Sequence, residues 1–102
     1  MGILHIVNKS PFTHNTLRSC IAVCTHEDTL LLIEDGVYGA IQNMPDTSAL
    51  LPLIDAKMAF YVLSSDVKAR AIEKKISAQV QLINYDEFVK LTLSHNPIQS
   101  WF

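Results

Sequence analysis

Hydrophobic residues along the chain fall into two recurring patterns. Four short runs are almost wholly apolar and end at polar or turn-forming residues; they span 3–7, 29–33, 57–63 and 80–83. Such runs are typical of strands that are buried on both faces of a parallel sheet. Between them lie segments in which apolar residues recur every three or four positions, the spacing that gives a helix one apolar face. The chain is therefore predicted to alternate strands with helices.

The clearest helical segments are the first and the last. The first is predicted at 14–25, where one face carries Leu17, Cys20, Ile21 and Cys24. The last is predicted at 85–94, with two acidic residues in its first turn, where the helix dipole favours anions. Three shorter helices are expected at 35–40, 50–54 and 64–74. Side-chain oxygens near their starts are expected to cap two of them, from Asp35 and from Ser64, Ser65 and Asp66.

These elements predict an α/β fold that forms a single domain over 1–102. The expected architecture is a small doubly wound, mostly parallel sheet of about four strands flanked by helices, as in flavodoxin-like folds. In such sheets the functional crevice lies beyond the carboxyl ends of the strands. Polar residues follow the first three predicted strands, and they include Lys9, Ser10, Glu34, Asp35, Ser64 and Ser65.

Composition narrows the class of protein. Hydrophobic residues make up 49% of the 102 positions, more than a small free-standing domain needs, so other subunits are expected to cover part of the surface. The net charge is −2, which predicts no direct binding of nucleic acid. No apolar run approaches the roughly 18 residues of a membrane span, and no signal-like segment opens the chain. With two cysteines and no disulfide framework, a cytoplasmic protein is expected.

The two cysteines are the candidate reactive groups. Cys20 and Cys24 share the apolar face of the first predicted helix, so each either packs in the core as a small hydrophobe or performs thiol chemistry. A disulfide between them is not expected. Side chains four positions apart on a helix hold their Cβ atoms about 5–6 Å apart, whereas a disulfide prefers a Cβ separation of ~3.8 Å.

Metal and cofactor sites are not predicted. The chain has four histidines: His5, His14, His26 and His95. Their spacing with one another and with the cysteines is unlike that of zinc ligands, and His5 is interpreted as a strand residue whose hydrogen bonds are satisfied. Gly36 and Gly39 lack the longer glycine pattern of a phosphate-binding turn and are expected to serve a helix cap instead.

Four segments of the sequence together carry a family resemblance: HIVNKSPF at 5–12, LLLIEDGVYGA at 30–40, YVLSSDVKAR at 61–70 and INYDEFVKLT at 83–92. They resemble the DsrH/TusB family of sulfur-relay subunits. The resemblance spans nearly the whole chain, as far as Trp101 near the C-terminus. It implies a DsrEFH-like fold and, in function, a subunit of a cytoplasmic sulfurtransferase complex.

The resemblance implies two related small α/β subunits as partners in a heterohexamer, which passes sulfur as a cysteine persulfide to a downstream acceptor protein. In one branch of the family, the sulfur reaches 2-thiouridine at the wobble position of tRNA. In the other branch, the complex carries sulfur during dissimilatory sulfur oxidation. A purely structural role within the same complex is a further alternative, in which Tyr38, Trp101 and Phe102 help to hold the partners.

Two positions of this chain bear on its role in such a complex. Cys20 matches the helix position at which DsrH-type members carry a cysteine, so it is the candidate persulfide site. Because dipole stabilisation fades beyond the first turn of a helix, a neighbour such as His14 or a partner surface would have to activate this thiol. The catalytic sibling subunit has a cysteine at the end of its third strand, where this chain has Leu63. The chain is therefore expected to be an accessory subunit.

A binding function is the alternative to the sulfur relay. A free-standing flavodoxin-like module would bind a flavin or a nucleotide beyond the carboxyl ends of the strands. Glu34 and Asp35 lie at that edge and would repel phosphate groups, so this reading is disfavoured.

Overall fold

The computed structural model describes residues 2–102, and it describes the side chains of all of these except residues 45–48. Strands and helices alternate along the whole chain. In order they are β1 (Leu4–Val7), α1 (Thr16–Val23), β2 (Thr29–Leu32), the 3-10 helix η1 (Glu34–Ala40), α2 (Pro45–Asp55), β3 (Ala59–Leu63), α3 (Ser64–Ala69), the 3-10 helix η2 (Glu73–Lys75), β4 (Gln81–Ile83), α4 (Tyr85–Ser94) and β5 (Ile98–Trp101).

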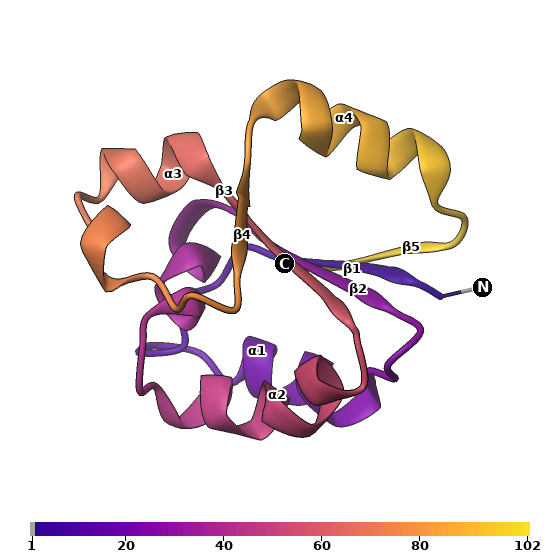
Figure 1. Ribbon diagram of the computed structural model, residues 1–102, viewed down its shortest axis with the longest axis horizontal. Coiled ribbons are helices and arrows are strands. Elements are labelled where there is room, and N and C mark those ends of the chain that lie inside the picture. The colour runs from indigo at the N-terminus through magenta and orange to yellow at the C-terminus, as the bar shows by residue number, and fades with distance from the viewer. Residues whose placement is uncertain (1) are drawn as a thin grey trace.

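The strands form one parallel sheet in the order β4-β3-β2-β1-β5. The chain adds β2, β3 and β4 successively on one side of β1, and α4 then carries it back across the sheet to β5 on the other side of β1 (Figure 1). This confirms the predicted α/β fold with a parallel sheet flanked by helices. The expected number of about four strands was too low, because β5 is a fifth strand. Its residues are mostly exposed, so no apolar run marked it in the sequence.

Alternate residues of the strands contribute to two hydrophobic cores, one on each face of the sheet. Helices α1, α2 and α3 cover one face, where the larger core is built from Val7, Leu17, Cys20, Leu30, Leu32, Leu50, Phe60, Val62 and Val67 with their neighbours. Helix α4 covers the other face, where Phe88 and Leu91 pack on Leu4, Ile6, Leu31, Ile33, Leu63 and Ile83. In Figure 1, α1 and α2 lie below the sheet and α4 lies above it. Each fully buried leucine contributes about 1.5–3 kcal/mol to stability.

Local hydrogen bonding explains where some helices begin, and it corrects two expected caps. Helix α4 starts with a capping box between Asn84 and Glu87, which accept each other's backbone N–H groups. Among the side chains that the structure describes, none caps η1 or α3. Asp35 instead accepts hydrogen bonds from the Arg70 guanidinium, and Asp66 accepts one from the backbone N–H of Glu34. Asp35 belongs to η1 and Asp66 to α3, so these hydrogen bonds hold the two helices together.

Further differences concern the helices between β2 and β4. Helix α2 begins at Pro45 and contains Pro52 in its interior, rather than in its first turn as expected. The segment predicted as one helix at 64–74 is α3 followed by η2. Gly36 is needed for close packing and not for a helix cap, since a Cβ atom there would lie 2.3 Å from the carbonyl oxygen of Val7. None of the helices within residues 2–102 combines the length and apolar character that crossing a bilayer requires.

Candidate thiol site

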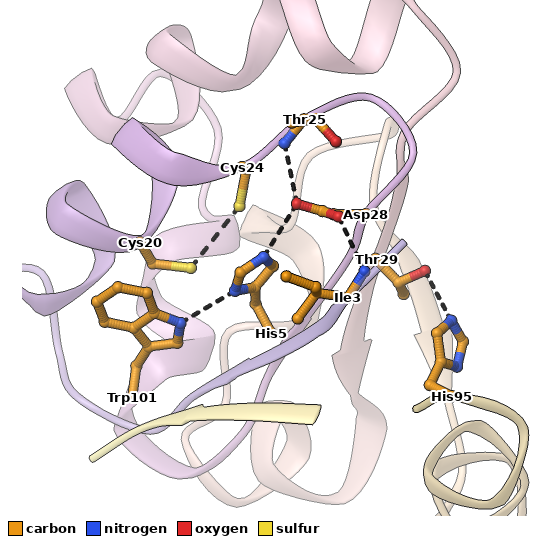
Figure 2. A network of polar contacts seen from close by, with 9 residues as sticks. All are labelled: Ile3, His5, Cys20, Cys24, Thr25, Asp28, Thr29, His95 and Trp101. Carbon is orange, nitrogen blue, oxygen red and sulfur yellow. Dashed lines mark hydrogen bonds and ion pairs between the residues drawn. The ribbon is translucent and has the colours of Figure 1, made fainter. Parts of the chain in front are cut away.

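A buried histidine lies on β1, next to the edge strand β5, on the face of the sheet covered by α1. His5 on β1 is 2% exposed, and its Nε2 lies 3.1 Å from Asp28 Oδ2. The indole Nε1–H of Trp101 points at His5 Nδ1 from a distance of 3.1 Å (Figure 2). An indole N–H can only donate, so Nδ1 accepts and the imidazole proton resides on Nε2, where it is donated to Asp28. The interpretation of His5 as a strand residue with satisfied hydrogen bonds is confirmed.

Asp28 anchors this network just before β2. Its carboxylate accepts the backbone N–H of Ile3 at 2.9 Å and that of Thr25 at 3.0 Å, in addition to the proton of His5. Burial raises the pKa of Asp28, but the hydrogen bonds from Ile3, Thr25 and His5 outweigh it and hold the pKa below its usual value. Asp28 is therefore a buried carboxylate whose ionised form stabilises the fold.

The two thiols lie beside this network. Cys20 is fully buried within α1, whereas Cys24 is half-buried at the residue that follows the helix. Their Sγ atoms are 3.8 Å apart, which is hydrogen-bonding distance for sulfur, and both thiols are free. Donating its proton to Cys24 and being buried both raise the pKa of Cys20, while the same S–H contact lowers the pKa of Cys24. Of the two thiols, the contact therefore favours ionisation of Cys24 over that of Cys20.

His5 and the two cysteines form a compact group, with their possible ligand atoms all within 4.8 Å of one another. Imidazole and thiolate are typical ligands of zinc and copper, and the spacing of these residues along the sequence did not reveal that the fold brings them together. Both nitrogens of His5 already hold hydrogen bonds, however, so a metal could bind this ring only by displacing Trp101 or Asp28. The arrangement favours thiol chemistry in a shielded place.

Other histidines lie apart from the thiols. His14, one candidate activator of Cys20, is exposed, and its Nδ1 pairs with the hydroxyl of Thr13 at 2.7 Å. His95 follows α4 and ties it to β2: Nδ1 donates to the carbonyl of Leu91 at 2.9 Å, and Nε2 accepts from the hydroxyl of Thr29 at 3.2 Å (Figure 2). His5, and not His14, is therefore the histidine near Cys20.

A carboxylate occupies the backbone N–H at the start of η1, beyond the carboxyl end of β2. Asp66 accepts the backbone N–H of Glu34 at the start of η1, an N–H that a phosphate would otherwise bind. Leu63, at the end of β3, is 7% exposed and belongs to the core under α4, on the opposite face of the sheet from Cys20. The end of β3 is thus occupied by a packed apolar side chain.

The hydrogen bond from Trp101 to His5 gives a prediction for stability. Replacing Trp101 with phenylalanine keeps an aromatic ring but leaves the buried Nδ1 of His5 without its donor. The free energy of unfolding should fall by about 1–3 kcal/mol. Urea unfolding followed by circular dichroism measures this change. The exposed neighbour provides a control, since Phe102→Leu should change stability by less than about 0.5 kcal/mol. Equal losses of unfolding free energy in the two variants would show that the hydrogen bond from the indole N–H does not stabilise the fold.

The sequence is similar to one family model and to curated proteins that share one name. Residues 9–98 match the family model described as "DsrH like protein". The chain is 35% identical to "Protein TusB" of Yersinia pestis (strain Pestoides F) and 37% identical to "Protein TusB" of Buchnera aphidicola subsp. Acyrthosiphon pisum (strain 5A). Each alignment extends over 99 residues and covers 97% of this chain and 100% of the relative.

Solved structures share the fold. The crystal structure of the ychN protein from E. coli superposes with a TM-score of 0.78 at 18% sequence identity and covers 98% of both chains. The solution structure of protein Tm0979 from Thermotoga maritima superposes with a TM-score of 0.65 at 24% identity and covers 93% of this chain and 95% of that one. At these identities the likeness shows the architecture alone.

Proposed function

The chain belongs to the DsrH/TusB family, and we propose that it is a subunit of a sulfur-relay complex that passes persulfide sulfur toward 2-thiouridine at the wobble position of tRNA. The observation that carries this proposal is the extent of the match to TusB proteins, which covers the whole of the relatives and 97% of this chain. A similarity without large unmatched segments supports a shared role as well as a shared fold.

The proposed partners are two related small α/β subunits, assembled with this chain into a heterohexamer, and a downstream protein that accepts the sulfur. Large apolar side chains on the surface are consistent with such an assembly; among them Phe12 is 65%, Phe102 67% and Leu93 81% exposed. The net charge of −2 supports contact with tRNA through the acceptor protein and not through this chain. Two unpaired cysteines suit the reducing cytoplasm.

Within the complex, we assign this chain an accessory role with Cys20 as its persulfide site. The buried apolar Leu63 supports the assignment of the principal sulfur carrier to a sibling subunit. Cys20 is buried beside a second thiol, so a persulfide on Cys20 would be shielded from water and from stray oxidants. This supports Cys20 as the persulfide site.

A second branch is favoured by one specific feature, the presence of a cysteine at position 20. In DsrH-type members this cysteine accompanies sulfur trafficking during dissimilatory sulfur oxidation. That function would use the same thiol and the same kind of complex but a different acceptor.

Cells that lack this chain test the proposal. We expect 2-thiouridine at the wobble position of tRNA to disappear and to return when the wild-type chain is supplied, as measured by mass spectrometry of digested tRNA. Supplying the Cys20→Ser variant should restore only part of it. Full restoration by this variant would show that Cys20 carries no sulfur and that the chain serves only to assemble the complex. Unchanged 2-thiouridine in cells that lack the chain would contradict the tRNA branch.

A further inference from the structure

We propose that sulfane sulfur enters this subunit at Cys24 and passes from Cys24 to Cys20, so that the two thiols act as an ordered pair. This inference rests on the proposed relay function and on Cys20 as its persulfide site. It assigns a role to Cys24, for which the family resemblance implies none.

Access to solvent sets the order of the two thiols. Cys20 is 0% exposed, so a persulfide held by a partner protein cannot reach its sulfur in this structure. Cys24 is half-buried and has exposed neighbours on both sides, with Val23 at 57% exposure and Thr25 also exposed. Cys24 also lies one residue beyond the end of α1, where its backbone is extended, so its side chain is not enclosed by a following helical turn. A partner's thiol can therefore approach Cys24 first.

The contact between the thiols makes Cys24 the nucleophile. The C-terminal end of a helix disfavours a negative charge, and burial and the nearby Asp28 also oppose a thiolate at Cys24. The S–H group of Cys20, 3.8 Å away, opposes these effects by donating to the Cys24 sulfur, and the balance lowers the pKa of Cys24. Cys20 thus acts first as a positioning residue for Cys24.

The transfer then takes two displacement steps that need no oxidant. The Cys24 thiolate attacks the terminal sulfur of the partner's persulfide, the partner's S–S bond breaks, and the partner leaves as a thiolate. Cys20 next attacks the terminal sulfur of the new Cys24 persulfide, and the proton of the Cys20 thiol passes to the departing Cys24 sulfur. Each step forms one S–S bond and breaks another, and the sulfane sulfur ends on Cys20. The reverse steps return it to Cys24 for delivery.

Loading with a small persulfide tests this order. The full chain and its Cys24→Ser and Cys20→Ser variants are treated with glutathione persulfide, alkylated, and digested, and each cysteine is examined for the added sulfur by fragmentation mass spectrometry. In the wild type we expect the persulfide on both cysteines. In Cys20→Ser, Cys24 should still be loaded, whereas in Cys24→Ser the loading of Cys20 should be slower by about tenfold or more. Circular dichroism of each variant confirms that it is folded.

Three results would overturn the inference. Loading of Cys20 in Cys24→Ser at the wild-type rate would show that Cys24 is not the entry point, while leaving Cys20 as a persulfide site. A wild-type product that contains a Cys20–Cys24 disulfide and free sulfide would show that Cys20 attacks the inner sulfur instead. No persulfide on either cysteine would remove both the inference and the assignment of Cys20, while the deletion experiment on tRNA would still decide the relay function.

A pH profile separates the positioning role of Cys20 from simple packing. The rate at which iodoacetamide alkylates Cys24 is measured against pH in the wild type, in Cys20→Ser and in Cys20→Ala. Serine keeps a hydrogen-bond donor and alanine does not, so the midpoint of the profile should move to higher pH in Cys20→Ala and move less in Cys20→Ser. Identical profiles in all three proteins would contradict the positioning role.

Discussion

Replacing Asp28 with alanine is expected to lower the free energy of unfolding by about 3–5 kcal/mol. The substitution leaves the part-buried backbone N–H groups of Ile3 and Thr25 and the buried imidazole N–H of His5 without their common acceptor. Urea unfolding at neutral pH measures the loss. Asp55→Ala provides a matched control at an exposed position, where we expect a change within about 0.5 kcal/mol. A loss at Asp28 no larger than at Asp55 would show that the network does not stabilise the fold.

The pH dependence of stability tests the same carboxylate. The pKa of Asp28 is lowered in the folded chain, so its ionised form contributes stability that is complete above the unfolded pKa of about 3.9. That contribution is lost as the pH falls through the lower pKa of the folded state. Below about pH 4, the wild type should therefore lose stability more steeply than Asp28→Ala. Parallel acid profiles of the two proteins would contradict this role of Asp28.

Replacing Leu63 with cysteine should not turn this chain into a principal sulfur carrier. Leu63 is packed in the core under α4, so the smaller side chain leaves a cavity and should cost about 2–4 kcal/mol of unfolding free energy. The thiol introduced at position 63 should also react slowly, because the side chain at this position is 7% exposed. Urea unfolding and iodoacetamide labelling, located by peptide mass spectrometry, measure the two effects.

A neighbouring strand position provides the comparison for Leu63. Leu82 on β4 is 40% exposed, so Leu82→Cys should be labelled rapidly and lose little stability. If the thiol at position 63 were labelled as fast as the one at position 82, with little loss of stability, the end of β3 would be an open site, and this chain would be a candidate for the carrier role.

Hydrophobic spacing predicted much of the fold because the sheet is parallel and buried. Helix α4 was predicted at 85–94 and spans those residues, and the four apolar runs contain β1, β2, β3 and β4. Strand β5 was missed because only one of its residues is even partly buried and its pairing with β1 depends on distant parts of the chain. The caps expected from Asp35 and Ser64 were wrong because local spacing cannot reveal that Asp35 pairs with Arg70, far along the chain.

The candidate site was predictable only in part. Spacing on one helix placed Cys20 and Cys24 together, and the structure confirms that neighbourhood. The partners of His5 are separated from it by 23 positions at Asp28 and by 96 at Trp101, so they meet only because β1 lies between β2 and β5 in the sheet. Neither charge nor periodicity carries that information, and the proximity of His5 to the thiols follows from topology alone.

Affinity purification of the tagged chain from its own cells, followed by mass spectrometry of the proteins that accompany it, tests the relay function most directly. We expect two related small subunits to be recovered, one of them with a cysteine at the end of its third strand. A downstream thiouridylase among the recovered proteins would support the tRNA branch, whereas proteins of sulfur oxidation would support the other. Recovery of the chain alone, or as an assembly of its own copies, would contradict the sulfur relay.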